Sequence, residues 1–272
     1  YEAFYETTPF LEKSPLGLQT SLSDFSQNLV YISSSTKSIN ESYELQKAKV
    51  SHVNYHANAL SSIFTNSKQD TLLVHFQLSN RDIGFYYEIR SKEGRSNIKI
   101  YKETTGFNIP DQATTYITPQ ALPMTGWMET KPSYEEPYTL NEAVGTPSAN
   151  GVGYTFPALF KLDQDKGWLL ISETGVDGQY PGARLGEATK DGLYPLEFPQ
   201  QGENSGIGDT FAAQPLPAKT PWRTITLGTS LKPIVESTVA FDLVKPKYEA
   251  STDYKMGRAT WSWIVWQDNS IN

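Results

Sequence analysis

The chain has 272 residues, which is long enough for one large β domain or two smaller ones, each with its own core. Its 30 acidic and 23 basic residues give a formal net charge of -7, and no Lys or Arg cluster offsets that sign, so we expect no nucleic-acid partner. The absence of cysteine excludes disulfides, thiolate metal sites and a cysteine nucleophile, and no apolar run is long enough to predict a membrane span.

Alternating apolar and polar residues predict short strands through the first 110 residues, with no helical periodicity. The clearest hairpin joins residues 72–78 to residues 83–89 through a polar turn. Further strands are predicted at residues 1–6, 37–45, 49–57 and 98–102, the first of them at a sheet edge and the next two half-buried and antiparallel. This succession of strands, with no repeat of fixed period, favours an all-β sandwich.

Two histidines, His52 and His56, fall on one face of the strand predicted at 49–57. Four residues of extended chain separate them by about 13 Å, which is too far for both to bind one metal ion. We therefore do not expect them to form a metal site.

Residues 110–150 contain many prolines and predict an ordered loop in place of long strands. Within this loop, Glu135 and Glu136 lie between Tyr134 and Tyr138. Their carboxylates could bind a sugar or a cation, but neighbouring residues of an extended chain point to opposite sides, so at most one of them could face a given site. Of the two, Glu135 is the predicted substrate-binding residue.

The most informative segment runs from residue 167 to residue 185. Its apolar start predicts a strand that pairs with residues 151–162 across a polar turn, and four residues, Gly175, Gly178, Pro181 and Gly182, then end regular structure. A carboxylate on such a strand end, here Glu173, can be directed at a metal or a sugar hydroxyl at little entropic cost. The alternative is that Glu173 and Asp177 are a solvated strand terminus and a turn residue.

The last third of the chain is mixed in character. Residues 191–221 are rich in Gly and Pro and predict a surface excursion without a strong strand, and residues 222–227 predict the last strand of the sandwich. Residues 231–241 form the only good candidate for a short helix. Residues 257–266 are apolar on both faces, as in a parallel strand buried between layers, so we expect further structure to follow it.

Six segments, taken together and in order, resemble the N-terminal region of glycoside hydrolase family 97, the family of bacterial α-glucosidases and α-galactosidases. They are SPLGL at 14–18, KPSYEEPYT at 131–139, GTPSANGVGYTFPALF at 145–160, ISETGVDGQYPGARL at 171–185, TPWRTITLG at 220–228 and MGRATWSWIVW at 256–266. The resemblance covers nearly the whole chain.

The resemblance implies a large antiparallel β-super-sandwich over residues 1–245. Residues 246–272 would be a linker and the first strand of a (β/α)8 catalytic barrel that is otherwise absent from the chain. It further implies that Glu173 reaches over the barrel mouth as a Ca²⁺ ligand beside the substrate. Candidate substrate-binding residues at the barrel are Trp261, Trp263, Trp266, Asp268 and Asn269, although the three tryptophans are expected first of all as the core of that first strand.

By the same resemblance, the parent protein would hydrolyse terminal α-linked glucose or galactose from oligosaccharides and would use Ca²⁺. It would work in the periplasm or outside a bacterial cell. The acid and base would come from the barrel, so this chain alone would be inactive, and neither the sugar nor the anomeric outcome follows from its residues. Two alternatives remain: a stand-alone carbohydrate-binding β-sandwich and a purely structural outer-surface protein.

Overall fold

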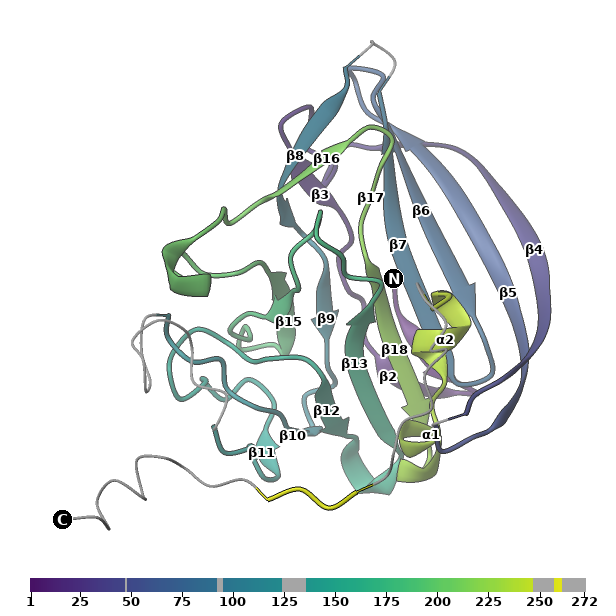
Figure 1. The fold of residues 1–272 in the computed structure, drawn as a ribbon, viewed down its shortest axis with the longest axis vertical. Coiled ribbons are helices and arrows are strands. Elements are labelled where there is room, and N and C mark those ends of the chain that lie inside the picture. The colour runs from purple at the N-terminus through teal and green to yellow at the C-terminus, as the bar shows by residue number, and fades with distance from the viewer. Residues whose placement is uncertain (47, 92–94, 124–135, 247–256, 261–272) are drawn as a thin grey trace.

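The computed structural model describes residues 1–46, 48–91, 95–123, 136–246 and 257–260. They form an all-β sandwich whose main layer is a ten-stranded antiparallel sheet (Figure 1). In spatial order its strands are β11 (Glu142–Ala143), β10 (Thr114–Tyr116), β12 (Ala158–Lys161), β13 (Trp168–Thr174), β18 (Trp222–Gly228), β7 (Asp82–Arg90), β6 (Thr71–Leu78), β5 (His52–Thr65) and β4 (Val30–Glu44), with β17 (Ala218–Lys219) paired to β7. The predicted β-super-sandwich is therefore confirmed.

Smaller sheets form the second layer. One contains β16 (Ala212–Pro215), β8 (Asn97–Glu103) and β3 (Leu18–Thr20), and the other contains β14 (Arg184–Leu185), β15 (Leu193–Glu197) and β9 (Gly106–Asn108). A short hairpin of β1 (Ala3–Tyr5) and β2 (Thr8–Leu11) completes the described strands. One large cluster of buried side chains, drawn from both layers, fills the space between them. Burial of these apolar side chains is the main favourable term that holds the layers together.

Side chains alternate across the main sheet with the period of two that strands impose. On β7 the side chains of Phe85, Tyr87 and Ile89 point into the core, whereas that of Tyr86 lies on the outer face. The hairpin predicted from residues 72–78 and 83–89 is confirmed, because β6 and β7 pair along their whole length with Leu72 opposite Ile89.

Two short helices cover the outer face of the main sheet: α1 (Leu231–Val235), which packs on β18 and β13, and α2 (Val239–Leu243), which packs on β7, β13 and β18 (Figure 1). The single helix predicted over residues 231–241 is therefore wrong. The helix breaks because Ser237 donates its hydroxyl to Asp82, and Thr238 donates its hydroxyl to Asp242. Hydroxyl side chains that bond outside the helical ladder favour helix ends over helix interiors. Two 3₁₀ turns, η1 (Asp163–Asp165) and η2 (Asn204–Gly206), complete the helical elements of the described residues.

Two other predictions from the sequence need correction. Residues 191–221 are not a strandless excursion, because they contain β15, β16 and β17. The strand predicted at 151–162 is confined to β12, which does pair with β13 as expected.

Residues 257–260 are exposed and irregular, and the rest of the predicted final strand lies outside the described residues. Among the described residues, no helix has the length and apolar character needed to cross a membrane.

Candidate functional site

Glu173 is the next-to-last residue of β13, so the prediction that it lies at the end of a strand is confirmed. It follows Ile171 on the face of β13 that points between the layers, and its register partner on β18 is Arg223. Its side chain is 14% exposed. The carboxylate therefore lies at the margin of the core, and it is not held out into solvent.

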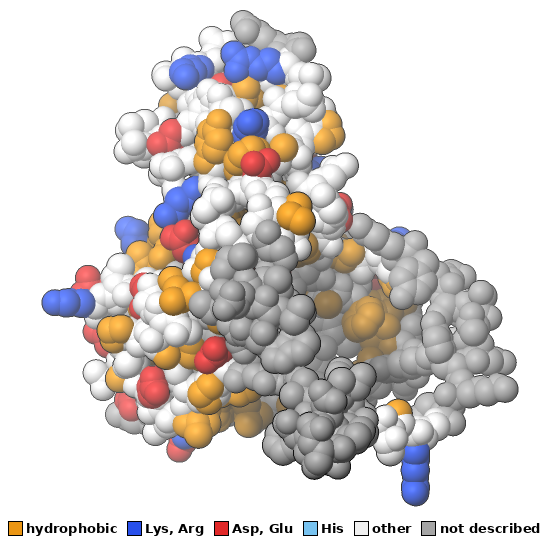
Figure 2. All heavy atoms as spheres, turned by 60° about the vertical axis from the view of Figure 1, so that its left-hand side comes forward, with side chains coloured by type: hydrophobic (Ala, Val, Ile, Leu, Met, Phe, Trp, Pro, Cys, Tyr) orange, Lys and Arg blue, Asp and Glu red, His pale blue; other side chains and the backbone are white. Residues whose placement is uncertain are grey.

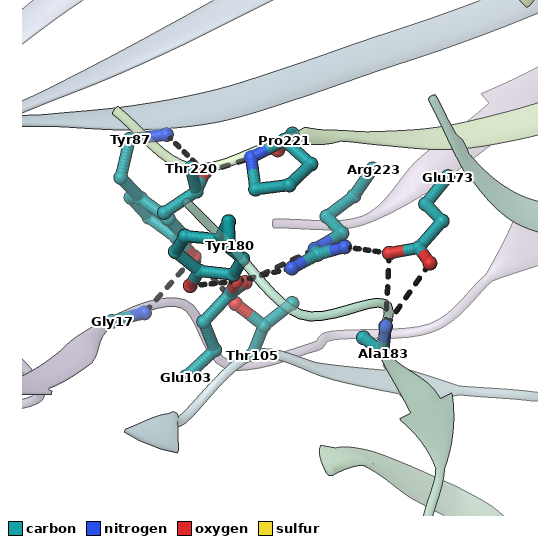
Figure 3. A network of polar contacts seen from close by, with 10 residues as sticks. All are labelled: Gly17, Tyr87, Glu103, Thr105, Glu173, Tyr180, Ala183, Thr220, Pro221 and Arg223. Carbon is teal, nitrogen blue, oxygen red and sulfur yellow. Dashed lines mark hydrogen bonds and ion pairs between the residues drawn. The ribbon is translucent and has the colours of Figure 1, made fainter. Parts of the chain in front are cut away.

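The partner of this carboxylate is a fully buried arginine. Arg223 donates from Nη1 to Oε2 of Glu173, and from Nη2 and Nε to the two oxygens of Glu103, a fully buried residue at the end of β8 (Figure 3). Burial alone would lower the pKa of Arg223, but the two carboxylates outweigh burial and raise it. The guanidinium is therefore always charged, and its two contacts with Glu103 are charge-assisted and bidentate.

These three side chains carry two negative charges and one positive charge. The net charge of the Glu103–Arg223–Glu173 triad is therefore -1, in a region that excludes most water. Burial raises the pKa of Glu173, and the nearby charge of Glu103 raises it further, whereas Arg223 and the amide of Ala183 act in the opposite direction. The triad is consequently a site where additional positive charge would be favourable.

The loop after β13 is fixed to this triad at two points. The Tyr180 hydroxyl donates to Glu103 Oε1 over 2.6 Å, and the Ala183 amide donates to both oxygens of Glu173 over 3.0 and 3.2 Å (Figure 3). Burial raises the pKa of Tyr180, so its phenol remains a proton donor at neutral pH. At the loop tip, Asp177 accepts a hydrogen bond from the Gln179 amide, which is the turn role that the sequence left open for it.

A second hydrogen-bonded pair lies beside the triad in the core. Tyr87 shares a hydrogen bond of 2.7 Å with Thr105 and accepts another, of 3.1 Å, from the amide of Gly17 (Figure 3). Thr105 follows Glu103 by two residues, so this bond also fixes the chain just beyond β8. Polar groups buried in this way stabilise a unique packing only when each has a partner.

Most of the other candidate site residues fall in segments for which no structure is described. Glu135, Trp261, Trp263, Trp266, Asp268 and Asn269 lie outside the described residues. His52 and His56 form hydrogen bonds with different partners, Glu44 and Asn40. Among the described residues, no group of three or more His, Cys, Asp or Glu side chains could hold a metal ion.

Sequence reasoning missed Arg223, Glu103 and Tyr180. For Arg223 a signal existed, because alternation along 222–228 puts it on the same face as Ile225 and Leu227. For Glu103 the sequence contained no such signal. Alternation from Ile98 and Ile100 would bury residue 102, but the pairing of β8 with β3 shifts register just before it, and residue 103 is buried instead.

The family model for the glycosyl-hydrolase 97 N-terminal domain matches residues 1–246. The chain belongs to this family. No functionally curated protein sequence matches it. Among solved structures, a β-arabinopyranosidase is 46% identical to this family 97 domain, with a TM-score of 0.90, over 97% of this chain and 42% of that one.

Structures of a glycoside hydrolase family 97 enzyme from Pseudoalteromonas sp. strain K8 show the same fold at lower identity. An arginine-to-lysine variant of that enzyme is 23% identical, with a TM-score of 0.74, over 90% of this chain and 35% of that one. A complex with panose is 21% identical, with a TM-score of 0.73 over the same shares of the two chains. The family 97 domain described here therefore spans less than half the length of the solved enzymes it matches.

Proposed function

We propose that this chain is the N-terminal domain of an exo-acting glycosidase that removes terminal sugars from oligosaccharides. The observation that carries the proposal is the match to the family 97 N-terminal model over residues 1–246. It is supported by 46% identity to a β-arabinopyranosidase over almost the whole chain. The catalytic acid and base would lie outside this chain, in the (β/α)8 barrel that the sequence resemblance implies, and the domain alone would be inactive.

For the sugar, we propose the galactose-like branch of the expected substrates over the glucose-like branch. In the L series, a β-arabinopyranoside has the ring stereochemistry of an α-D-galactopyranoside without its C6 hydroxymethyl group. The β-arabinopyranosidase shares 46% of its aligned residues with this chain, against 21% for the enzyme solved with panose. The proposed substrates are therefore terminal β-L-arabinopyranosides and α-D-galactosides, processed in the periplasm or outside the cell.

The experiment for the sugar uses the full-length parent protein. Its rates on the 4-nitrophenyl β-L-arabinopyranoside, α-D-galactoside and α-D-glucoside would be compared as kcat/KM. We expect the first two to exceed the third by at least tenfold. A preference for the glucoside would overturn the choice of sugar, and no hydrolysis of any glycoside would overturn the glycosidase assignment in favour of a carbohydrate-binding module.

We also propose that Glu173 is one oxygen ligand of a Ca²⁺ ion in the parent protein. Its carboxylate is partly exposed and belongs to a triad with a net charge of -1, which supports the binding of a further cation. Calcium takes six to eight oxygen ligands, and no cluster of three or more His, Cys, Asp or Glu side chains among the described residues could hold a metal ion, so further ligands would have to come from elsewhere. The ion would supply positive charge that neutralises and orients groups around the scissile bond.

The test of this role is Ca²⁺ affinity, measured by isothermal titration on the full-length protein. We expect Glu173→Gln to weaken binding by tenfold or more, since even partners outside the ligand shell commonly change metal affinity by ~10–100-fold. The matched control is Asp177→Asn, which removes the same charge from the tip of the adjoining loop and should leave the affinity unchanged. Unchanged affinity in Glu173→Gln would instead confine Glu173 to holding Arg223 and the loop.

A further inference from the structure

The strand β4 lies at the open edge of the ten-stranded sheet, and in Figure 1 nothing is drawn beyond it. It spans 15 residues and, within the described part of the chain, pairs on one side only, with β5. All of its side chains are exposed except those of Ile39 and Tyr43, which are half-buried on the outer face. The sequence predicts a half-buried strand here, but the second layer does not extend far enough to cover it.

A long edge strand presents a row of unpaired backbone groups, because every second residue directs its N–H and C=O away from the sheet. Protein edges are commonly protected by proline, charged residues, bulges or short length. Between residues 33 and 44, β4 contains no proline, its one register shift lies before residue 33, and its charged residues are Lys37, Glu41 and Glu44. This edge is therefore competent to pair with another strand.

We propose that β4 pairs with β4 of a second copy of the chain, antiparallel about a two-fold axis at Ile39. Residues opposite each other in such a pair either both direct their backbone groups toward the partner strand or both direct them away from it, so their numbers must sum to an even value. With the axis at Ile39 the numbers sum to 78, and Lys37 faces the partner's Glu41 while Glu41 faces the partner's Lys37. The two copies would thus form two identical ion pairs on one face of a continuous sheet.

Charge complementarity selects this register over its neighbours. Moving the axis by one residue in either direction leaves Lys37 and Glu41 opposite uncharged residues. Moving it by two places Lys37 opposite Lys37, or Glu41 opposite Glu41, and like charges directly opposite are unfavourable. Among the registers near the centre of β4, only the one centred on Ile39 pairs opposite charges.

Within a single copy these two charges are not held in ion pairs with other described residues, and Glu41 acts on the phenol of Tyr55, whose pKa is raised mainly by burial and in small part by the Glu41 charge. Lys37 and Glu41 belong to none of the ion pairs among the described residues, and their neighbours on β5 are Ala59 and Tyr55. Reversing either charge should therefore leave the folded monomer intact. This permits a charge-exchange test in which the partner strand is the only element affected.

The test measures the dimer dissociation constant of the full-length parent protein by sedimentation. We expect Lys37→Glu alone, or Glu41→Lys alone, to weaken association by about 10- to 30-fold, because two opposite-charge contacts become two like-charge contacts. The double exchange Lys37→Glu/Glu41→Lys should restore association to within about threefold of the original. A protein that is monomeric at all concentrations, or a dimer indifferent to these exchanges, would overturn the proposal.

A covalent test of the register is available because the chain has no cysteine. On the proposed axis Ile39 lies directly opposite its own copy, within the Cα separation of 4.4–6.8 Å that a disulfide needs. Ile39→Cys should therefore form a disulfide-linked dimer under mild oxidation, whereas Ser35→Cys, which faces the partner's Tyr43, should not. Equal cross-linking of the two variants, or none in Ile39→Cys, would overturn the register.

Discussion

The buried triad makes a strong prediction for Arg223→Met. This change leaves Glu103, which is fully buried, and Glu173, which is 14% exposed, without their shared guanidinium. Removing one partner of a buried ion pair costs about 3–5 kcal/mol, since an uncompensated charge remains in a poorly hydrated site. We expect a loss of that size in the free energy of unfolding, or roughly 6–20 °C in the melting temperature of the domain.

The assay is urea unfolding followed by tryptophan fluorescence, with a matched arginine as control. Arg90 also pairs with a glutamate, Glu88, over 2.6 Å; the Glu88 carboxylate is 7% exposed, but the Arg90 side chain is 57% exposed, and Lys219 lies 3.8 Å from the same carboxylate. Glu88 therefore keeps a cationic neighbour when Arg90 is removed, and a pair with one exposed partner is screened by solvent, so Arg90→Met should cost about 1 kcal/mol or less. The difference between the two variants reports the cost of leaving a buried carboxylate with no cation beside it.

A second variant separates charge from packing. Glu103→Gln added to Arg223→Met removes the buried carboxylate charge while retaining its shape, so the double variant should be more stable than Arg223→Met alone. If the double variant is no more stable, the loss arises from the missing side-chain volume of Arg223 and not from an unpaired charge. A cost below 1 kcal/mol for Arg223→Met would refute the reasoning altogether.

Three further predictions concern other buried groups. Burial raises the pKa of Asp82 above its value in the unfolded chain. The stabilising contribution of Asp82 is therefore present below the pKa of the unfolded chain and is lost as the pH rises through the pKa of the folded chain. In urea unfolding, Asp82→Asn should consequently gain stability relative to the parent chain as the pH rises from 4 to 7. Hydrogen bonds from Ser148 and Gly153 outweigh burial and lower the pKa of Glu187, so the cost of Glu187→Gln should shrink on acidification, and a constant cost would contradict this. Gly153→Ala should lower the free energy of unfolding by more than about 3 kcal/mol, because residue 153 has a φ of +88° and the added Cβ would collide with the Leu185 carbonyl. Gly151 has a φ of +68°, but no atom would lie within 4 Å of an added Cβ, so Gly151→Ala should cost about 1 kcal/mol in the same assay.

Much of the fold follows from local pattern, and its failures have identifiable causes. Alternation predicts the hairpin of β6 and β7 because each strand has one apolar face toward the core. The same reasoning fails at β15, where Pro195 and the preceding Gly192 indicate a loop, although Tyr194 and Leu196 are fully buried. Proline is tolerated in sheets only at positions where its missing N–H is not needed, and the sequence alone does not reveal those positions.

The candidate site was predictable only in part. The end of β13 and the glycines after it are local signals, and they locate Glu173 correctly. Glu103 and Glu173 lie 70 residues apart in the chain, and both bind Arg223 on a third strand. A register shift in β8 decides that residue 103 points inward. Contacts of this kind depend on how sheets stack and on bulges, which carry no periodic signature in one sequence.

The triad also constrains how Glu173 could act on anything outside this domain. An ion pair with Arg223 and two bonds from the Ala183 amide fix the carboxylate in one orientation, so binding a cation there would cost little additional ordering. A lone Glu173–Arg223 pair would be neutral and would repel a second cation through the guanidinium. Because Glu103 supplies a further negative charge, the site instead has a net charge of -1, and this excess makes cation binding by Glu173 electrostatically favourable. If Glu173 binds Ca²⁺ as proposed, replacing Glu103 by Gln should therefore weaken that binding in the parent protein even though Glu103 is fully buried, and an unchanged affinity would show that the excess charge plays no part.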